Sequence, residues 1–355
     1  MKHIIKTSIL LISLAILASC SDWTKPESIE ISKNSIADSN PELYAKYCEA
    51  LREYKNSDHK ITYATYENSS DVVANGSQKI SMIPDSVDFV QFMNTEVSEA
   101  NLSEMKQVKN TFGTRFVVRF SVTDCEAAYE AYVAEMEAAA EEAEGEETEG
   151  EEGTVTEPEI ATFETFYAEE LKKVTDKVAE YGLDGFTFEF TGKNIDGMTA
   201  AQQEEYAATS AMVMAPLKTW IAANSSKVFF LEGNPQYVLD AEVLAAASYF
   251  ILPTRECRSV GELGLFGLNA YTSGKLPEGA KLLYTVETPS FIEEEYLVGQ
   301  FVLGEQIPLA AEWLAKDASF DKSGLVIWNL QRDYFNPGFT YPNVRQAIKV
   351  MNPNE

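Results

Sequence analysis

Apolar and polar positions follow a recurring pattern along most of the chain. Short apolar runs, rich in aromatic and β-branched residues, return at intervals, and each is typical of a buried strand. We therefore predict eight strands, at residues 61–66, 87–93, 115–122, 186–190, 228–231, 249–252, 282–286 and 325–330. All are much shorter than the roughly eighteen apolar residues that a membrane-spanning helix needs.

Helical spacing of apolar residues separates most of these strands. In residues 163–180 apolar side chains recur every three or four positions, and the segment stops before Gly182, a residue favoured just after a helix. The other predicted helices are residues 41–55, 200–223, 240–247, 301–316 and 344–351. Strands that alternate with helices in this way predict an α/β protein with a closed (β/α)8 (TIM) barrel. An open doubly wound sheet is the alternative, although no glycine-rich phosphate loop follows any strand.

The start of the chain has the pattern of a bacterial lipoprotein signal. A short basic segment precedes the apolar residues 9–17, and two small residues stand directly before Cys20. We expect residues 1–19 to be a cleaved signal peptide, Cys20 to be lipidated, and residues 20–58 to form a tether and a leading helix. The barrel is then expected at residues 59–352, anchored by lipid in the cell envelope, on the surface of the outer membrane. An ordinary cleaved signal with a chance cysteine is the alternative.

The chain is strongly acidic, with a formal net charge of −28. Nucleic acid is therefore not expected as a partner, because phosphates would be repelled. Much of the charge is local, since residues 134–158 form a glutamate-rich low-complexity insertion after the third strand. Like charges repel, so we interpret the insertion as a solvated, disordered loop beside the barrel mouth. A site for calcium or a cationic partner is the alternative.

Few residues are available for metal or nucleophilic chemistry. Apart from Cys20, the cysteines are Cys48, Cys125 and Cys257, and their wide spacing matches no metal-binding pattern. One disulfide with a free thiol and three buried thiols fit this number equally. His59 is the one histidine outside the predicted signal, so a serine–histidine–aspartate triad is not expected. The sequence indicates no metal and no cofactor.

The fourth predicted strand carries the most informative motif, residues 181–191, which read YGLDGFTFEFT. Alternate residues of a strand face the same side, so Thr187, Glu189 and Thr191 are predicted to point into the barrel and the phenylalanines between them outward. With Asp184 and Gly185 in front, the motif resembles the signature of glycoside hydrolase family 18, apolar-D-G-x-D-x-D-x-E. That family places the signature on barrel strand four, as the strand order does here.

The resemblance implies a chitinase-like or endo-β-N-acetylglucosaminidase-like protein with altered chemistry. In the family, the last glutamate of the motif protonates the leaving oxygen, and the neighbouring aspartate holds the 2-acetamido group whose carbonyl attacks the sugar. Thr187 and Glu189 stand at the two inner aspartate positions, and Thr191 stands at the position of that glutamate. A threonine hydroxyl cannot donate a proton near pH 7, and Glu189 lies one inner position deeper, about 6–7 Å along the strand. The resemblance therefore predicts a pseudoenzyme with no assigned catalytic residue among Asp184, Thr187, Glu189 and Thr191.

The last predicted strand adds a candidate sugar-binding residue. Residues 324–329 resemble the family's final strand, in which a tryptophan floors the sugar subsite, and Trp328 would stack on a sugar in this way. A barrel-core aromatic is the alternative interpretation of Trp328. Residues 331–348 also resemble a lipoprotein branch of the family found in gut Bacteroidetes. Since ligands of such barrels bind at strand ends, the predicted glycan-binding set is Tyr66, Glu189, Glu232, Asn234, Glu287, Trp328 and Asn329.

Three functions fit these features. The first is a cell-surface lipoprotein that captures a glycan containing N-acetylglucosamine (GlcNAc) without cleaving it and passes it to an outer-membrane importer. The second is an active endo-glycosidase or chitinase-type hydrolase on β-1,4-linked GlcNAc that uses Glu189 or another carboxylate, such as Glu232 or Glu287. The third is a structural adaptor of an outer-membrane glycan-uptake complex, with the acidic insertion as its docking element.

Overall fold

The computed structural model describes residues 36–353, except 69–72, 146–159, 291, 293–296 and 336–337. The predicted signal peptide, Cys20 and the first part of the tether lie outside the described residues. Within the described ranges, no helix combines the length and the apolar character needed to cross a bilayer. Residues 48–355 form one compact unit, which contains the barrel.

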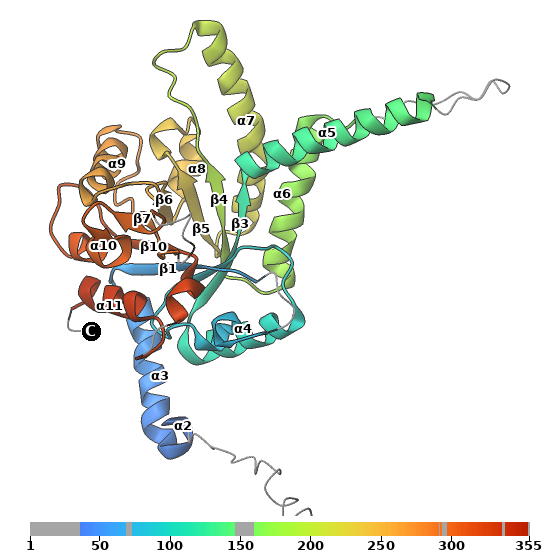
Figure 1. Cartoon of the computed structure of the whole chain (residues 1–355). Helices are drawn as coiled ribbons and strands as arrows, with labels where there is room; N and C mark the ends of the chain where they lie inside the picture. Colours follow the sequence, from blue (N-terminus) through green and yellow to red (C-terminus); the bar gives the residue numbers. More distant parts are fainter. Residues whose placement is uncertain are drawn as a thin grey trace, which may run out of the picture. The chain divides into compact units, whose positions relative to one another are not determined.

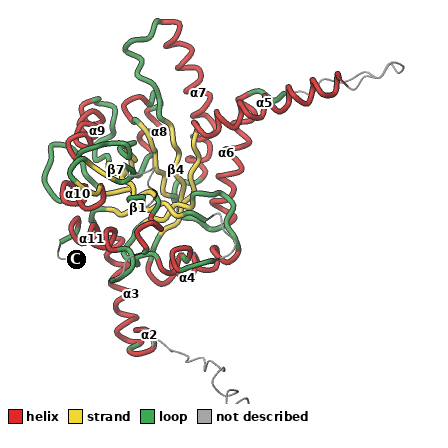
Figure 2. Tube along the Cα trace, viewed as in Figure 1, coloured by secondary structure: helices red, strands yellow, loops and turns green. Residues whose placement is uncertain are grey.

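Eight parallel strands close into a barrel in the order β1-β10-β7-β6-β5-β4-β3-β2. The predicted (β/α)8 barrel is therefore confirmed, and the open doubly wound sheet is wrong. Figure 2 shows the strands at the centre, with helices around them. The barrel strands are β1 (Ile61–Tyr66), β2 (Phe89–Phe92), β3 (Arg115–Ser121), β4 (Gly185–Phe190), β5 (Val228–Gly233), β6 (Tyr249–Leu252), β7 (Leu282–Glu287) and β10 (Gly324–Trp328). A two-stranded antiparallel hairpin, β8 (Gln300–Phe301) and β9 (Gly304–Glu305), follows β7.

The helices include several that the apolar pattern predicted and some that it did not. Two of them, α6 and α7, have the predicted bounds, whereas α4, α5 and α9 were not predicted. The helices are α2 (Ile36–Ser39), α3 (Pro41–Asn56), α4 (Glu99–Phe112), α5 (Val122–Gly145), α6 (Phe163–Glu180), α7 (Ala200–Ala223), α8 (Ala241–Ala246), α9 (Val260–Thr272), α10 (Gln306–Leu314) and α11 (Pro342–Met351). Short 3-10 turns lie at Gly76–Gln78, Ile80–Met82, Pro235–Tyr237 and Leu330–Tyr334.

Helix α9 was not predicted because a tertiary contact requires a residue of low helix propensity within it. Its sequence contains three glycines, which lower helix propensity by about 1 kcal/mol each relative to alanine. A Cβ at Gly267 would lie 2.2 Å from the hydroxyl oxygen of Tyr284, so the close approach of α9 to the barrel requires glycine there. The tertiary packing of α9 therefore outweighs its weak local propensity.

The acidic insertion is helical for as far as the structure describes it. Helix α5 starts directly after β3 and continues to Gly145, so the prediction of a disordered loop is wrong for residues 134–145. Tyr129 and Tyr132 hold the start of α5 against Phe166 of α6, and alanine and glutamate then propagate a helix readily once it is nucleated. Figure 1 shows α5 running outward from the end of β3. The remainder of the insertion lies outside the described residues.

Two apolar layers stabilise the barrel. The inner layer consists of side chains that fill the barrel, among them Tyr63 and Phe230, whose rings meet edge to face with centroids 5.0 Å apart. The outer layer lies between strands and helices and includes Phe186, Phe188 and Phe190 of β4. The predicted alternation along β4 is therefore confirmed: the phenylalanines face the helices, and the polar residues between them face the barrel.

Aspartates at the amino ends of two strands fasten neighbouring strands together. Asp88 accepts a hydrogen bond from the backbone N–H of Thr62 in β1 (2.8 Å). Asp184 accepts one from the N–H of Phe116 in β3 (2.9 Å) and pairs with Lys109 of α4 at 2.7 Å. Charge-assisted hydrogen bonds of this kind are about twice as strong as neutral ones. These carboxylates therefore stabilise the end of the barrel opposite the mouth.

The cysteines form no disulfide in the described part of the chain. Cys48, Cys125 and Cys257 are all buried and free. Burial raises the pKa of the Cys125 thiol to about 11 and that of Cys257 to about 12. Of the two arrangements that the sequence left open, the structure has three buried thiols, and those of Cys125 and Cys257 remain protonated at neutral pH.

Candidate functional site at the barrel mouth

The site begins with a hydrogen-bonded polar group inside the barrel, below the mouth. The hydroxyl of Tyr63 donates to the side-chain oxygen of Gln91 at 2.6 Å and lies 2.8 Å from the hydroxyl oxygen of Thr187. Tyr63 and Thr187 are fully buried, and Gln91 is 3% exposed. Burial raises the pKa of Tyr63 far above its ordinary value, so its hydroxyl stays protonated. Thr187, the first inner position of the motif, therefore belongs to the barrel core.

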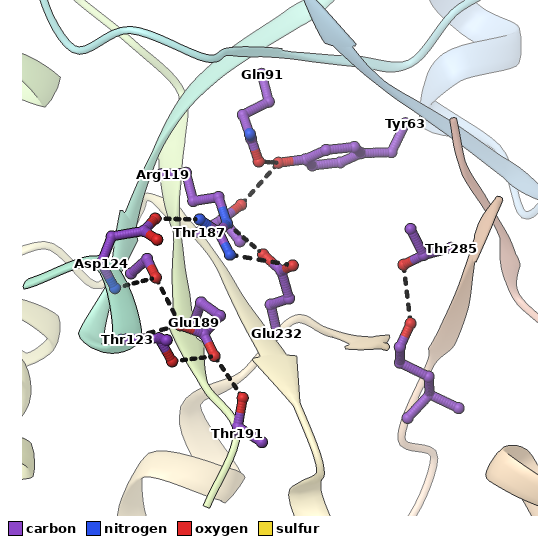
Figure 3. Close-up of polar contacts among 12 residues, drawn as sticks. Tyr63, Gln91, Arg119, Thr123, Asp124, Thr187, Glu189, Thr191, Glu232 and Thr285 are labelled. Carbon is purple, nitrogen blue, oxygen red and sulfur yellow. Dashed lines mark hydrogen bonds and ion pairs between the residues drawn. The ribbon is translucent and has the colours of Figure 1, made fainter. Parts of the chain in front are cut away.

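Glu189 lies one level higher, where hydroxyl groups surround its carboxylate. Ser121 donates to one carboxylate oxygen at 2.7 Å, and Thr191 donates to the other at 2.7 Å. Thr123 adds longer hydrogen bonds from its backbone N–H and its hydroxyl, both 3.4 Å. Figure 3 shows Thr123, at the start of α5, and Thr191, directly after β4, on either side of the Glu189 carboxylate. With only 6% of the residue exposed, the carboxylate is held as an acceptor within the wall of the mouth.

Glu232 pairs with an arginine that the sequence pattern did not single out. Register places Glu232 of β5 beside Glu189 of β4, and Arg119 of β3 reaches Glu232 with N–O distances of 2.7 and 3.4 Å. Arg119 also contacts Asp124 at 3.1 Å. Burial raises the pKa of Glu232, and the Arg119 guanidinium opposes that rise. The pair is partly desolvated, because 19% of the Arg119 side chain and 13% of the Glu232 side chain remain exposed.

Glu287 is the third carboxylate of the mouth, and it too is occupied. The side-chain amide of Asn329 donates to Glu287 at 2.6 Å, and Arg332 reaches the same oxygen at 3.2 Å. Arg255 contacts the other oxygen at 3.6 Å. The backbone N–H of Glu287 donates to Gln306 of α10 at 2.9 Å. Three carboxylates and three guanidiniums therefore meet at the mouth, and each carboxylate has a cation or hydroxyl groups against it.

Trp328 ends β10 beside Glu287, in the register that joins β10 to β7. Its ring packs against the inner barrel layer and is partly buried. The guanidinium carbon of Arg255 lies 4.6 Å from the ring centroid, and that of Arg119 lies 5.8 Å away. Cations at these distances are attracted to the ring, so a sugar that stacks on Trp328 would share the ring with guanidinium groups or displace one of them.

Other predicted site residues lie in different places. Tyr66 is 1% exposed and packs against Phe92 in the outer layer, so its prediction as a mouth residue is wrong. Strand alternation is the reason, because Tyr63 faces the barrel and Tyr66, three positions later, faces the helices. Asp184 lies at the opposite end of the barrel, as described above. Asn234 lies near the mouth, where its side-chain amide donates to the backbone carbonyl of Thr191 at 3.2 Å.

The motif glycine also has a structural role. A Cβ at Gly185 would lie 1.8 Å from the carbonyl oxygen of Val228, so only glycine fits where β4 approaches β5. Arg119 and Ser121 were missed by sequence reasoning, although both occupy inward positions of a buried strand. A charged residue within such a strand was the signal that could have drawn attention to Arg119. In the described part of the chain, no cluster of histidine, cysteine and acidic residues is arranged to hold a metal ion.

Asp333 gives a testable pH dependence next to the mouth. It lies in the turn Leu330–Tyr334, is 6% exposed, and accepts the backbone N–H of Val344 at 2.9 Å. Burial raises its pKa to about 6 from an ordinary 3.8. A raised carboxyl pKa means that the folded state binds the proton more tightly, so stability is lost as pH rises from about 4 past 6, by about 3 kcal/mol in all.

We expect Asp333→Asn to remove this loss, because the amide oxygen still accepts from Val344 and carries no charge. Between pH 5 and pH 7.5 the unfolding free energy of the variant should rise relative to wild type by roughly 1.5 kcal/mol, about half of the full effect. Urea denaturation at the two pH values measures this difference. A difference that does not change with pH would mean that Asp333 is not protonated more readily in the folded protein.

Comparison with known proteins agrees with the barrel and its motif. The family model described as glycoside hydrolase family 18, BT1044-like, matches residues 24–350. A structure of BT1044 with a glutamate-to-glutamine substitution has a TM-score of 0.59 and 17% identity, over 89% of this chain and 95% of that one. The endo-β-N-acetylglucosaminidase from Cordyceps militaris has a TM-score of 0.55 and 13% identity, over 87% of this chain and 96% of that one.

A chitinase from Bacteroides thetaiotaomicron has a TM-score of 0.52 and 9% identity, over 82% of this chain and 96% of that one. Identities this low establish a shared fold and nothing about substrate. A comparison with curated protein sequences gives no match. Because the family model covers most of the chain, this protein belongs to glycoside hydrolase family 18, in its BT1044-like group.

Proposed function

We propose that this protein is a non-hydrolytic member of family 18 that binds a glycan containing GlcNAc at the barrel mouth. One observation carries the proposal: Thr191 occupies the motif position of the proton-donating glutamate, and its hydroxyl donates to Glu189 at 2.7 Å. A hydroxyl committed in this way cannot protonate a leaving glycosidic oxygen near pH 7. Loss of the donor removes the hydrolytic step and leaves the scaffold that holds the sugar.

The other mouth carboxylates are poor replacements for the missing donor. Glu189 accepts hydrogen bonds at both oxygens, Glu232 pairs with Arg119, and Glu287 receives Asn329 and Arg332. A general acid must present its proton within about 2.6–3.2 Å of the leaving oxygen. To do so, Glu232 would have to leave its guanidinium while still buried, and breaking a buried ion pair costs about 3–5 kcal/mol.

The aromatic and polar groups of the mouth support glycan binding. Trp328 is partly buried at the end of β10, with Asn329 and Glu287 beside it. Aromatic rings stack on the apolar C–H faces of sugars, and amide and carboxylate groups bond to hydroxyls. An endo-β-N-acetylglucosaminidase and a chitinase share this fold, which favours a GlcNAc-containing ligand. The lipoprotein-type start of the chain favours a place on the outer-membrane surface, where the protein would pass its glycan to an importer.

Two measurements on the same preparation test the proposal. Mass spectrometry after incubation with an N-glycosylated protein and with chito-oligosaccharides should show no cleavage, whereas calorimetry should show binding of at least one of these ligands. Binding without cleavage supports the proposal. Cleavage at an ordinary enzymatic rate refutes the non-hydrolytic assignment, and absence of binding to every GlcNAc glycan refutes the ligand.

Replacing Trp328 tests the stacking surface. We expect Trp328→Ala to weaken glycan binding about tenfold, because an aromatic contact contributes about 0.5–1.5 kcal/mol beyond the area it buries. Trp328→Phe keeps a ring and should retain most of the affinity. Calorimetry of both variants, with thermal melts to verify folding, measures the effect. Equal affinity of Trp328→Ala and wild type would place the glycan away from β10.

A further inference from the structure

A hollow lies beside the mouth, between the end of β4 and the helices α5 and α7. It has a volume of about 570 Å³ and is bounded by the start of α5, the end of β4 with the loop that follows it, and one side of α7. Ligand pockets for small molecules usually enclose about 300–1,000 Å³. Trp328, Glu232 and Glu287 do not line it. The hollow is therefore distinct from the part of the mouth that these three residues form. We call it the α5–α7 pocket.

The walls of the α5–α7 pocket combine apolar and polar groups. Val122, Phe190 and Val213 provide apolar surface, whereas Thr209 and Ser210 of α7 provide hydroxyls. Ser210 is only 3% exposed, and the Thr209 hydroxyl donates to the backbone carbonyl of Glu205 at 3.1 Å, so its oxygen can still accept a hydrogen bond from a ligand. Apolar surface next to hydroxyl groups suits a pyranose ring, which has C–H faces and a rim of hydroxyls.

The shape of the pocket is fixed by hydrogen bonds on its outer side. Tyr206 accepts a hydrogen bond from the backbone N–H of Lys193 at 3.0 Å and donates one to the carbonyl of Tyr237 at 3.1 Å. Thr199 and Gln202 form a reciprocal cap at the start of α7. Walls held before binding cost less conformational entropy when a ligand arrives. The α5–α7 pocket therefore does not depend on a flexible segment to take its shape.

Charge limits the class of ligand. Glu126 and Glu205 line the pocket with one cation, Lys193, and the whole chain carries a formal charge of −28. An anionic ligand would be repelled, whereas carboxylates and hydroxyls accept and donate hydrogen bonds to neutral sugars. The lining therefore favours an uncharged saccharide of one or two residues.

The α5–α7 pocket is joined to the mouth by two hydroxyls. Thr123 and Thr191 both donate to Glu189 and both line the pocket. A glycan that extends from the mouth past Thr191 would enter the pocket directly. We propose that the α5–α7 pocket is a second saccharide subsite for a neutral sugar residue, separate from the Trp328 mouth. This inference builds on the proposed function, because the subsite would hold another residue of the same glycan.

Substitutions on α7 can fill the pocket without touching the mouth. Thr209→Trp places a large ring in the pocket from an exposed helical position, and Ala208→Trp places the same ring on the adjacent exposed position outside it. Trp328→Ala changes the mouth alone. Saturation-transfer NMR with GlcNAc, mannose, galactose and N,N′-diacetylchitobiose would report binding of small neutral sugars to wild type and to each variant, with thermal melts to verify folding.

We expect at least one of these sugars to bind wild type and Ala208→Trp alike, and to lose at least tenfold in affinity with Thr209→Trp. If no small sugar binds wild type, or if Thr209→Trp and Ala208→Trp behave alike, the subsite is refuted even where calorimetry shows a whole N-glycan in the mouth. Loss of small-sugar binding with Trp328→Ala alone would also refute the subsite, and it would support the mouth. If no N-glycan binds but a small sugar binds and Thr209→Trp abolishes that binding, glycan binding at the mouth is refuted and the subsite is supported.

Discussion

The double variant Glu189→Asp/Thr191→Glu is expected to hydrolyse a chitobiose-containing glycan at least about 100-fold faster than wild type. It places carboxyl groups at the two outer positions of the β4 motif, where the family has an aspartate and a glutamate. General acid catalysis typically contributes about 10²–10⁴-fold. Position 191 is exposed at the end of β4, so a longer side chain can be accommodated there. Release of the reducing-end product, followed by mass spectrometry, measures the rate.

A matched amide variant separates chemistry from shape. Glu189→Asn/Thr191→Gln has nearly the same side-chain volumes and no proton to donate, so it should cleave the glycan no faster than wild type. Thr191→Glu alone should be less active than the double variant. In the single variant Glu189 would remain beside the new glutamate and would still accept the hydrogen bond from Ser121. An inactive double variant that still binds the glycan would show that the mouth holds the sugar away from position 191.

Removing Arg119 is expected to destabilise the protein by about 3–5 kcal/mol. In Arg119→Met the partly buried Glu232 would lose the guanidinium that lies 2.7 Å away. Burial already raises the pKa of Glu232, so without the cation the carboxyl would take up a proton more readily. The loss should therefore be greatest at neutral pH and smaller near pH 5. Urea denaturation at both pH values measures it.

Two companion variants identify the cause of that loss. Arg119→Met/Glu232→Gln removes both charges and should recover most of the stability, because replacing both members of a buried pair is often close to neutral. Arg255→Met removes a guanidinium whose side chain is 40% exposed and lies 3.6 Å from Glu287, and it should cost at most about 1 kcal/mol. An equal loss of unfolding free energy in Arg119→Met and in Arg119→Met/Glu232→Gln would mean that packing of the arginine, rather than its charge, stabilises the mouth.

The Glu189/Thr191 and Arg119 variants both change the carboxylates of the barrel mouth. Thr191 stands where the family motif has its outermost acid, and the remaining carboxylates have partners within the protein. Ser121 and Thr191 donate hydrogen bonds to the two oxygens of Glu189, and Arg119 donates to Glu232. If the double variant becomes active, loss of the donor is the main defect. If it binds without cleaving, the paired carboxylates and guanidiniums of the mouth hold the sugar away from position 191.

The barrel and its central motif could be read from the sequence. Runs such as residues 249–252, with aromatic and β-branched residues, are typical of a buried strand, and the structure places β6 there. Alternation along β4 fixed which residues face the barrel, because side chains of a strand point to opposite sides in turn. That local rule was sufficient to place Thr187 and Glu189 inside and the phenylalanines outside.

Along β1 the same rule says only that Tyr63 and Tyr66 face opposite sides. The structure decides which is which: Tyr63 faces the barrel and Tyr66 faces the helices. Helix α5 was not predicted for another reason. Repulsion within its run of glutamates favours a disordered loop when the sequence is considered alone. In the structure the start of that helix is nucleated by tyrosines packed on α6. Propensity and charge act locally, whereas nucleation by packing depends on a partner elsewhere in the chain.

The sequence by itself determined the eight-stranded scaffold, the family motif and the absence of a glutamate at position 191, because these depend on the order and type of neighbouring residues. Only the tertiary structure decided which groups meet at the mouth. Arg119 and Glu232 are 113 positions apart in the chain and 2.7 Å apart in space, and no pattern in either segment specifies that pair. The strand order places β3 and β5 on the two sides of β4, and the inward-facing arginine reaches across β4 to the carboxylate.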